Sequence, residues 1–159
     1  MFGFKKRSDR RSILTVAAPA DGRLIALEEV PDPVFSRGLA GPGFAVVPSS
    51  GKITAPIAGT VILVPETHHA VGIRTADGAE VLVHVGIDSV TLKGEGLTSL
   101  VEVGDEVEQG TPVLEVDLPL LSKRLPSVAT PVVITNADQF EVSSADLTSA
   151  DRVVTITTP

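Results

Sequence analysis

The chain has 159 residues and a formal net charge of −7, and it contains no cysteine, tryptophan or tyrosine. With 43% hydrophobic and 21% charged residues, its composition fits one globular domain that buries a substantial core, and it excludes a disordered chain. The lack of cysteine excludes disulfides, thiolate metal sites and a cysteine nucleophile, and it fits a cytoplasmic location.

Charge is distributed unevenly between the first residues and the rest of the chain. Residues 1–11 carry a net charge of +4, which leaves 8 basic and 19 acidic residues in the remainder. We expect residues 1–15 to form a basic flexible tail, and residues 1–11, through Phe2 and Phe4, to offer a weak contact to an anionic membrane. The alternative is a tail without partners. The acidic body disfavours nucleic acid and favours basic partners. No apolar run has the length of a membrane helix, and no secretory signal is recognisable.

Short β-branched segments separated by proline and glycine follow one another along residues 16–159. They predict an all-β fold, an antiparallel β-sandwich or barrel-like single domain with at most short helices. The one helix expected is residues 117–125, with Asp117 as its cap and Pro119 in its first turn. The predicted strands lie in residues 44–48, 59–65, 81–87, 111–117, 130–136 and 152–158.

A hairpin is predicted where residues 68–75 and 80–86 flank the tripeptide Ala-Asp-Gly at 76–78. With Asp77-Gly78 as a two-residue turn, Val71 would pair with His84, and His69 with Gly86. Either two-residue turn places His69 and His84 on one face, because side chains alternate along a strand. Val71, Ile73 and Leu82 would share that face, and His68 would lie on the other. The prediction requires an even number of loop residues.

The chain has three histidines, at positions 68, 69 and 84, and the predicted hairpin brings two of them together. Two imidazoles can hold zinc with a carboxylate and water, can exchange protons as a general acid and base, or can accept a phosphoryl group on a ring nitrogen. They can also be partly buried structural residues. The residues alone leave these readings open.

Several separated segments resemble the glucose-type IIA family of the bacterial phosphoenolpyruvate-dependent sugar phosphotransferase system. The resemblance extends from about Val16 to the C-terminus and includes "VLVHVGIDSVTLKGEG" at 81–96 and "APIAGTVILVPETHHAVGI" at 55–73. Residues 30–48, 101–121 and 130–136 match as well. It implies an antiparallel β-sandwich, with His84 phosphorylated on Nε2, His69 supporting the phosphoryl group, and Thr67 orienting His69.

The resemblance also implies a surface on which partner proteins dock. Gly86 would orient the active imidazole through its carbonyl and belong to that surface. Asp32 and Asp88 would meet an arginine of the phosphocarrier protein HPr. The shallow apolar depression between them would be lined by Val34, Phe35 and Val90.

The function implied is that of a phosphotransferase component. It would take a phosphoryl group from phospho-HPr and pass it to a cysteine of a IIB domain during sugar uptake. No cofactor is required, although zinc could be shared between His69, His84 and a partner protein. The alternative is a regulatory module whose phosphorylation state controls docking to permeases or metabolic enzymes.

Two other classes of protein are disfavoured by the sequence. A zinc peptidase of the related β-sandwich kind needs an HxH pair, which is absent. A biotinyl or lipoyl carrier needs a lysine in an exposed turn with suitable neighbours, whereas residues 93–96 fit better as a loop at the edge of the histidine site. The sugar cannot be identified from the sequence, because the membrane permease selects it.

Overall fold

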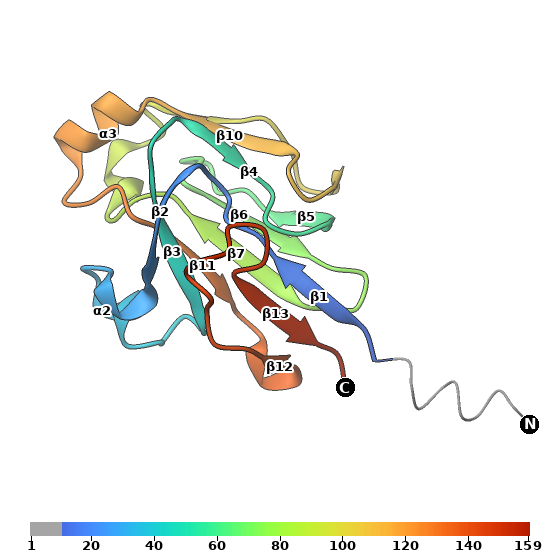
Figure 1. Ribbon diagram of the computed structural model, residues 1–159. Helices are drawn as coiled ribbons and strands as arrows, with labels where there is room; N and C mark the ends of the chain where they lie inside the picture. The colour runs from blue at the N-terminus through green and yellow to red at the C-terminus, as the bar shows by residue number, and fades with distance from the viewer. Residues whose placement is uncertain (1–10) are drawn as a thin grey trace, which may run out of the picture.

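The computed structural model describes residues 11–159, and within them the strands form three antiparallel sheets (Figure 1). The largest has the order β2-β3-β11-β7-β6-β5-β9, and two three-stranded sheets have the orders β1-β13-β12 and β4-β10-β8. The strands are β1 Ile13–Val16, β2 Gly22–Ala26, β3 Gly43–Pro48, β4 Lys52–Thr54, β5 Gly59–Leu63, β6 Ala70–Arg74, β7 Glu80–His84, β8 Leu97–Ser99, β9 Glu106–Val107, β10 Pro112–Val116, β11 Thr130–Ile134, β12 Glu141–Val142 and β13 Val154–Thr157.

Helical segments are short, as the sequence predicts. The helix expected after the strand at 112–116 is α3, Leu118–Arg124, and the Asp117 side chain accepts a hydrogen bond from Leu120 N. A one-turn helix, α2, covers Pro33–Ser36, with η1 before it at Leu27–Glu29. Two further 3-10 turns are η2, Ser89–Leu92, and η3, Ala137–Gln139. No helix among residues 11–159 is long and apolar enough to cross a membrane.

Two hydrophobic cores lie on opposite faces of the seven-stranded sheet. The main core joins all three sheets, and Val71, Ile73 and Val83 are completely buried in it. A smaller core lies under η1 and α2 and contains Phe35 and Val133, with Leu82 packed against it. Alternation along each strand explains the division, because successive side chains point to opposite faces.

The predicted boundary between tail and domain was wrong by a few residues. Residues 13–16 form β1, which pairs with β13 from Ile13↔Thr157 to Val16↔Val154. The sheet therefore begins inside the segment expected to be a tail. The predicted membrane contact through residues 1–11 lies almost wholly outside the described residues.

The β6–β7 hairpin has a register different from the predicted one. Ala70 pairs with His84, and the bond from Thr75 N to Ala79 O encloses a three-residue loop, 76–78. Gly78 adopts a φ of 93°, as expected where a turn is followed by a left-handed residue in a three-residue hairpin loop. The odd loop shifts the pairing by one residue. The prediction that Val71 and Ile73 share a face with His84 was therefore wrong.

Candidate functional site

His84 is the last residue of β7, and its imidazole points toward the smaller core. The ring lies beside that of Phe35, with centroids 5.1 Å apart and planes tilted by 54°. Its Nδ1 lies 2.9 Å from the carbonyl oxygen of Gly86. Because a carbonyl can only accept, Nδ1 carries the proton and Nε2 keeps a free lone pair.

Gly86 occupies a backbone position that favours glycine. Its φ is 72°, and a Cβ there would lie 2.6 Å from Cδ1 of Leu125. The Leu125 side chain thus lies beside the turn that aims the Gly86 carbonyl at His84, a neighbour that no pattern in the sequence signals. Three residues later, the hydroxyl of Ser89 is buried without a hydrogen-bond partner among residues 11–159.

His69 meets His84 although the strand register alone would not bring them together. Val85 N donates to His69 O over 2.8 Å, so His69 continues the pairing in which Ala70 lies opposite His84. Strict alternation would then turn His69 away from His84. However, His69 precedes β6 and follows His68, whose left-handed φ of 53° interrupts the extended strand geometry. The two rings lie 5.1 Å apart at 76°, so the predicted convergence is confirmed while its stated reason was wrong.

Thr67 holds the second imidazole. Its hydroxyl lies 2.5 Å from Nδ1 of His69, which leaves Nε2 as the free ring nitrogen. The loop at 93–96 lies alongside, since a Cβ on Gly94 would be 3.9 Å from the Thr67 carbonyl oxygen. This agrees with the prediction that the loop borders the histidine site.

Burial makes both imidazoles weaker bases than usual. The pKa of His84 is lowered by burial first and then by the neighbouring His69, while the Gly86 carbonyl and the Asp32 carboxylate act in the opposite direction. Burial also lowers the pKa of His69. Both rings are therefore neutral at pH 7, as a nitrogen nucleophile must be.

The residues expected to form a docking surface fall into two groups. Val34 and Val90 are 48% and 53% exposed, and Asp88, two residues before Val90, is exposed at a left-handed φ of 61°. Asp32 caps α2 by accepting a 2.9 Å bond from Val34 N.

Phe35 and Gly86 form the second group, and both are buried in the structure. Phe35 is 5% exposed and Gly86 is buried. They lie beneath the surface because the ring and the carbonyl support the His84 imidazole, so they offer almost no area to a partner.

Residues 11–159 contain no cluster of three or more His, Cys, Asp and Glu side chains that could hold an ion. His69 and His84 alone would supply two of the four ligands of a tetrahedral zinc site.

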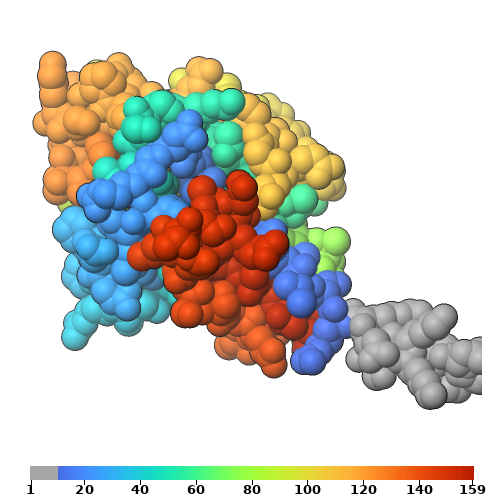
Figure 2. Space-filling model, viewed as in Figure 1, coloured from blue at the N-terminus to red at the C-terminus, as the bar shows by residue number. Residues whose placement is uncertain are grey.

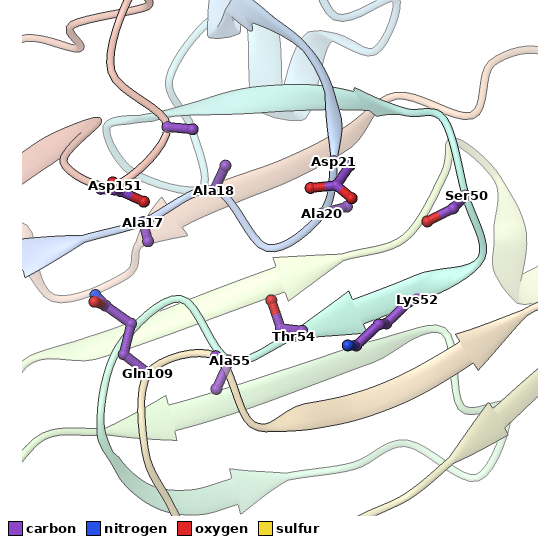
Figure 3. A pocket seen from close by; sticks show the side chains of 12 residues that line it. Ala17, Ala18, Ala20, Asp21, Ser50, Lys52, Thr54, Ala55, Gln109 and Asp151 are labelled. Carbon is purple, nitrogen blue, oxygen red and sulfur yellow. The ribbon is translucent and has the colours of Figure 1, made fainter.

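A cavity of about 380 Å³ lies away from the histidines, near the β1–β2 connection and β4 (Figure 3). We call it the remote cavity. Its walls contain none of the residues that hold or border the two imidazoles; they are Ala17, Ala18, Ala20, Asp21, Ser50, Lys52, Thr54, Ala55, Gln109, Gly110, Ala150 and Asp151.

Comparisons with known proteins agree with this geometry. Residues 14–140 match the family model of the phosphoenolpyruvate-dependent sugar phosphotransferase system, EIIA 1. The chain is 40% identical over 164 residues to the glucose-specific EIIA component of a phosphotransferase system from Halalkalibacterium halodurans, covering 99% of this chain and 95% of the relative. The glucose permease IIA from Mycoplasma capricolum superposes with a TM-score of 0.82 at 37% identity, over 91% of this chain and 96% of that one.

Proposed function

Because the chain belongs to the EIIA 1 family of the phosphoenolpyruvate-dependent sugar phosphotransferase system, and so is a phosphoryl carrier of sugar uptake, we propose that Nε2 of His84 carries the phosphoryl group. The observation that supports this atom is the 2.9 Å contact between Nδ1 and the Gly86 carbonyl. That contact fixes the tautomer in which Nε2 has the lone pair, and it orients the ring for attack.

The proposed transfer has two steps. In the first, the Nε2 lone pair attacks the phosphorus of a phosphohistidine on HPr, the P–N bond to HPr breaks, and its imidazole leaves with the bonding electrons. In the second, a cysteine thiolate of a IIB domain attacks the same phosphorus, and the bond to Nε2 breaks. Most of the catalysis would come from positioning, since the neighbouring Phe35 ring and the Gly86 carbonyl restrict the His84 imidazole.

His69 is proposed to stabilise the phosphoryl group during both steps. Its ring meets that of His84 edge-on at 5.1 Å, and Thr67 holds its Nδ1. When Thr67 donates to Nδ1, Nε2 carries a proton that can be donated to a phosphoryl oxygen. A partly buried donor is worth more than one in water, because the local dielectric constant is lower.

Docking is proposed to occur on the surface formed by Val34 and Val90, with the carboxylates of Asp32 and Asp88 at its border. An apolar patch bordered by acids suits a partner with an apolar face and an arginine, such as HPr. Because both similar proteins are named for glucose, we propose that the chain serves glucose uptake, and that it does so in the cytoplasm.

Phosphorylation with phosphoenolpyruvate, enzyme I and HPr tests the acceptor. The wild-type chain should gain one phosphoryl group, mapped to His84 by mass spectrometry and labile to acid. The variant His84→Ala should gain none, whereas the matched control His68→Ala should be labelled like the wild type. Label that persists in folded His84→Ala would refute the assignment.

A regulatory role is the second candidate, and the exposed Val34 and Val90 are the observation that favours it. A phosphoryl group on His84 would add a charge of about −2 near this apolar patch and weaken docking of an apolar partner. Such a partner could complete a zinc site on His69 and His84. Proteins retained by the phosphorylated and unphosphorylated chain should therefore differ; identical sets in both states would count against this role.

A further inference from the structure

A second cavity, of about 470 Å³, lies between the η1–α2 segment and residues 143–147. Its volume falls in the range of about 300–1,000 Å³ that small-molecule sites occupy. In Figure 2 the red segment near the C-terminus lies against the blue segment that includes η1 and α2. We call it the Phe35 cavity, and its walls are Ala26, Leu27, Glu28, Phe35, Ser36, Arg37, Gly38, Pro42, Gly43, Ser143, Ser144, Ala145 and Leu147.

Phe35 connects this cavity to the phosphoryl site. It lines the cavity, and its ring centroid lies 5.1 Å from that of His84. Phe35 belongs to the smaller core, where it is packed with Leu27, a second wall residue. An occupant of the cavity would therefore press on a side chain that restricts the imidazole, and packed aromatic rings transmit such displacement because they fit closely.

The chemistry of the walls indicates the kind of occupant. Leu27, Phe35 and Leu147 are apolar wall residues, of which Leu147 is 37% exposed and the other two are buried, and Glu28 and Arg37 add one charge of each sign. Neither charged side chain forms a salt bridge with another residue between 11 and 159. A single anion would meet an attractive and a repulsive group, and so would a single cation. A zwitterion with an apolar body matches the apolar surface and both charges.

We propose that the Phe35 cavity binds a small zwitterion with an apolar body, of the class of an α-amino acid with an apolar side chain, and that Phe35 transmits its presence to His84. The proposed binding of the zwitterion does not depend on the proposed function. The consequence for phosphoryl transfer rests on the function proposed above, and the tests therefore read the His84 ring directly.

The remote cavity offers a contrast within the same molecule. It contains two carboxylates, on Asp21 and Asp151, and one ammonium, on Lys52, and its walls are rich in alanine (Figure 3). It contains charges of both signs but no large apolar side chain, so it lacks a surface for the apolar body of the proposed ligand. Lys52 is therefore a matched control for Arg37.

Three probes of similar shape test the charge requirement in ¹⁵N-labelled full-length chain by NMR titration: L-phenylalanine, 3-phenylpropionate and 2-phenylethylamine. L-Phenylalanine should shift the amide signals of the cavity walls with the lowest dissociation constant. Each single-charge probe should bind roughly fivefold more weakly, because it lacks a partly exposed ion pair. Glu28→Gln should abolish the preference over 3-phenylpropionate, and Arg37→Gln the preference over 2-phenylethylamine.

Lys52→Gln should leave all three dissociation constants unchanged. Equal binding of the three probes, shifts confined to the remote cavity, or no binding would each overturn the proposed site.

Transmission is tested through the ring signals of His84 in chain labelled with ¹³C-histidine. L-Phenylalanine should shift them in the wild type and leave them unchanged in Phe35→Leu, which keeps an apolar wall but removes the ring. Amide shifts at the cavity without a response of His84 in the wild type would refute transmission, while leaving the phosphoryl acceptor untouched. Failure of His84 to accept a phosphoryl group would refute the proposed function and leave both titrations valid.

Discussion

The regular part of the β6–β7 hairpin and its open end differ in what they contribute. From Val71 to Arg74 and from Glu80 to Val83 the strands pair without interruption, and the side chains on one face, Val71, Ile73, Val81 and Val83, are buried. At the open end, where His68 and Gly86 have positive φ, the alternation fails and the polar rings emerge. Regular pairing therefore provides stability, and the irregular ends bring the two imidazoles together.

Ile73→Ala should have the largest effect on stability, because Ile73 is fully buried in the regular part. Truncation to alanine in a core lowers the free energy of unfolding by about 2–5 kcal/mol. Urea denaturation should show this loss, while the folded fraction still accepts a phosphoryl group at the wild-type level. A defect in acceptance by fully folded protein would mean that the regular strands also shape the site.

Gly86→Ala should have an intermediate effect and act on both properties. The new Cβ would meet Leu125 at 2.6 Å, and the φ of 72° would be strained, which costs about 1–3 kcal/mol. We expect a lower denaturation midpoint and slower phosphorylation of His84. Adding Leu125→Ala should recover part of the rate relative to Gly86→Ala; a double variant as slow as the single one would show that the collision with Leu125 is not the cause.

Thr67→Val should leave stability nearly unchanged and slow the transfer. Valine keeps the shape but removes the hydroxyl on Nδ1 of His69, and one such hydrogen bond is worth about 1 kcal/mol. Single-turnover measurements should show slower transfer to the IIB cysteine, and Thr67→Ser should restore it. Equal rates for valine and serine would exclude orientation of His69 by the hydroxyl.

The smallest effect is expected for Asp32→Asn, on the protonation of His84. Asp32 acts to raise the pKa of His84, so Asp32→Asn should lower that pKa further, as measured by NMR titration of the ring. A wild-type value above 6.5 would contradict the buried, neutral imidazole described here.

The lowered histidine pKa values also set a pH dependence of stability. The unfolded chain binds protons at these two histidines from about pH 6.5 downward, before the native chain does. The free energy of unfolding should therefore fall as the pH drops below about 6.5 toward the lowered native pKa values. Replacing His69 and His84 together by glutamine should flatten this part of the curve in urea titrations; an unchanged slope would assign it to other groups.

Local patterns in the sequence determined the element types. Short β-branched segments between proline and glycine became strands, and Asp117 with Pro119 began the one predicted helix, since these signals act through the nearest few residues. The family motifs likewise singled out His69 and His84, whose convergence the structure confirms.

Only the tertiary structure decided how those histidines meet. The loop has one residue more than expected, which shifts the pairing so that regular alternation would turn His69 away from His84. The left-handed φ of His68 interrupts that alternation and turns the His69 ring back toward His84. The burial of Phe35 also depends on contacts between segments far apart in the chain. The face of the sheet to which a side chain points depends on whether the hairpin loop has an odd or an even number of residues. Burial depends on residues far apart in the chain, so neither property can be derived from local propensity.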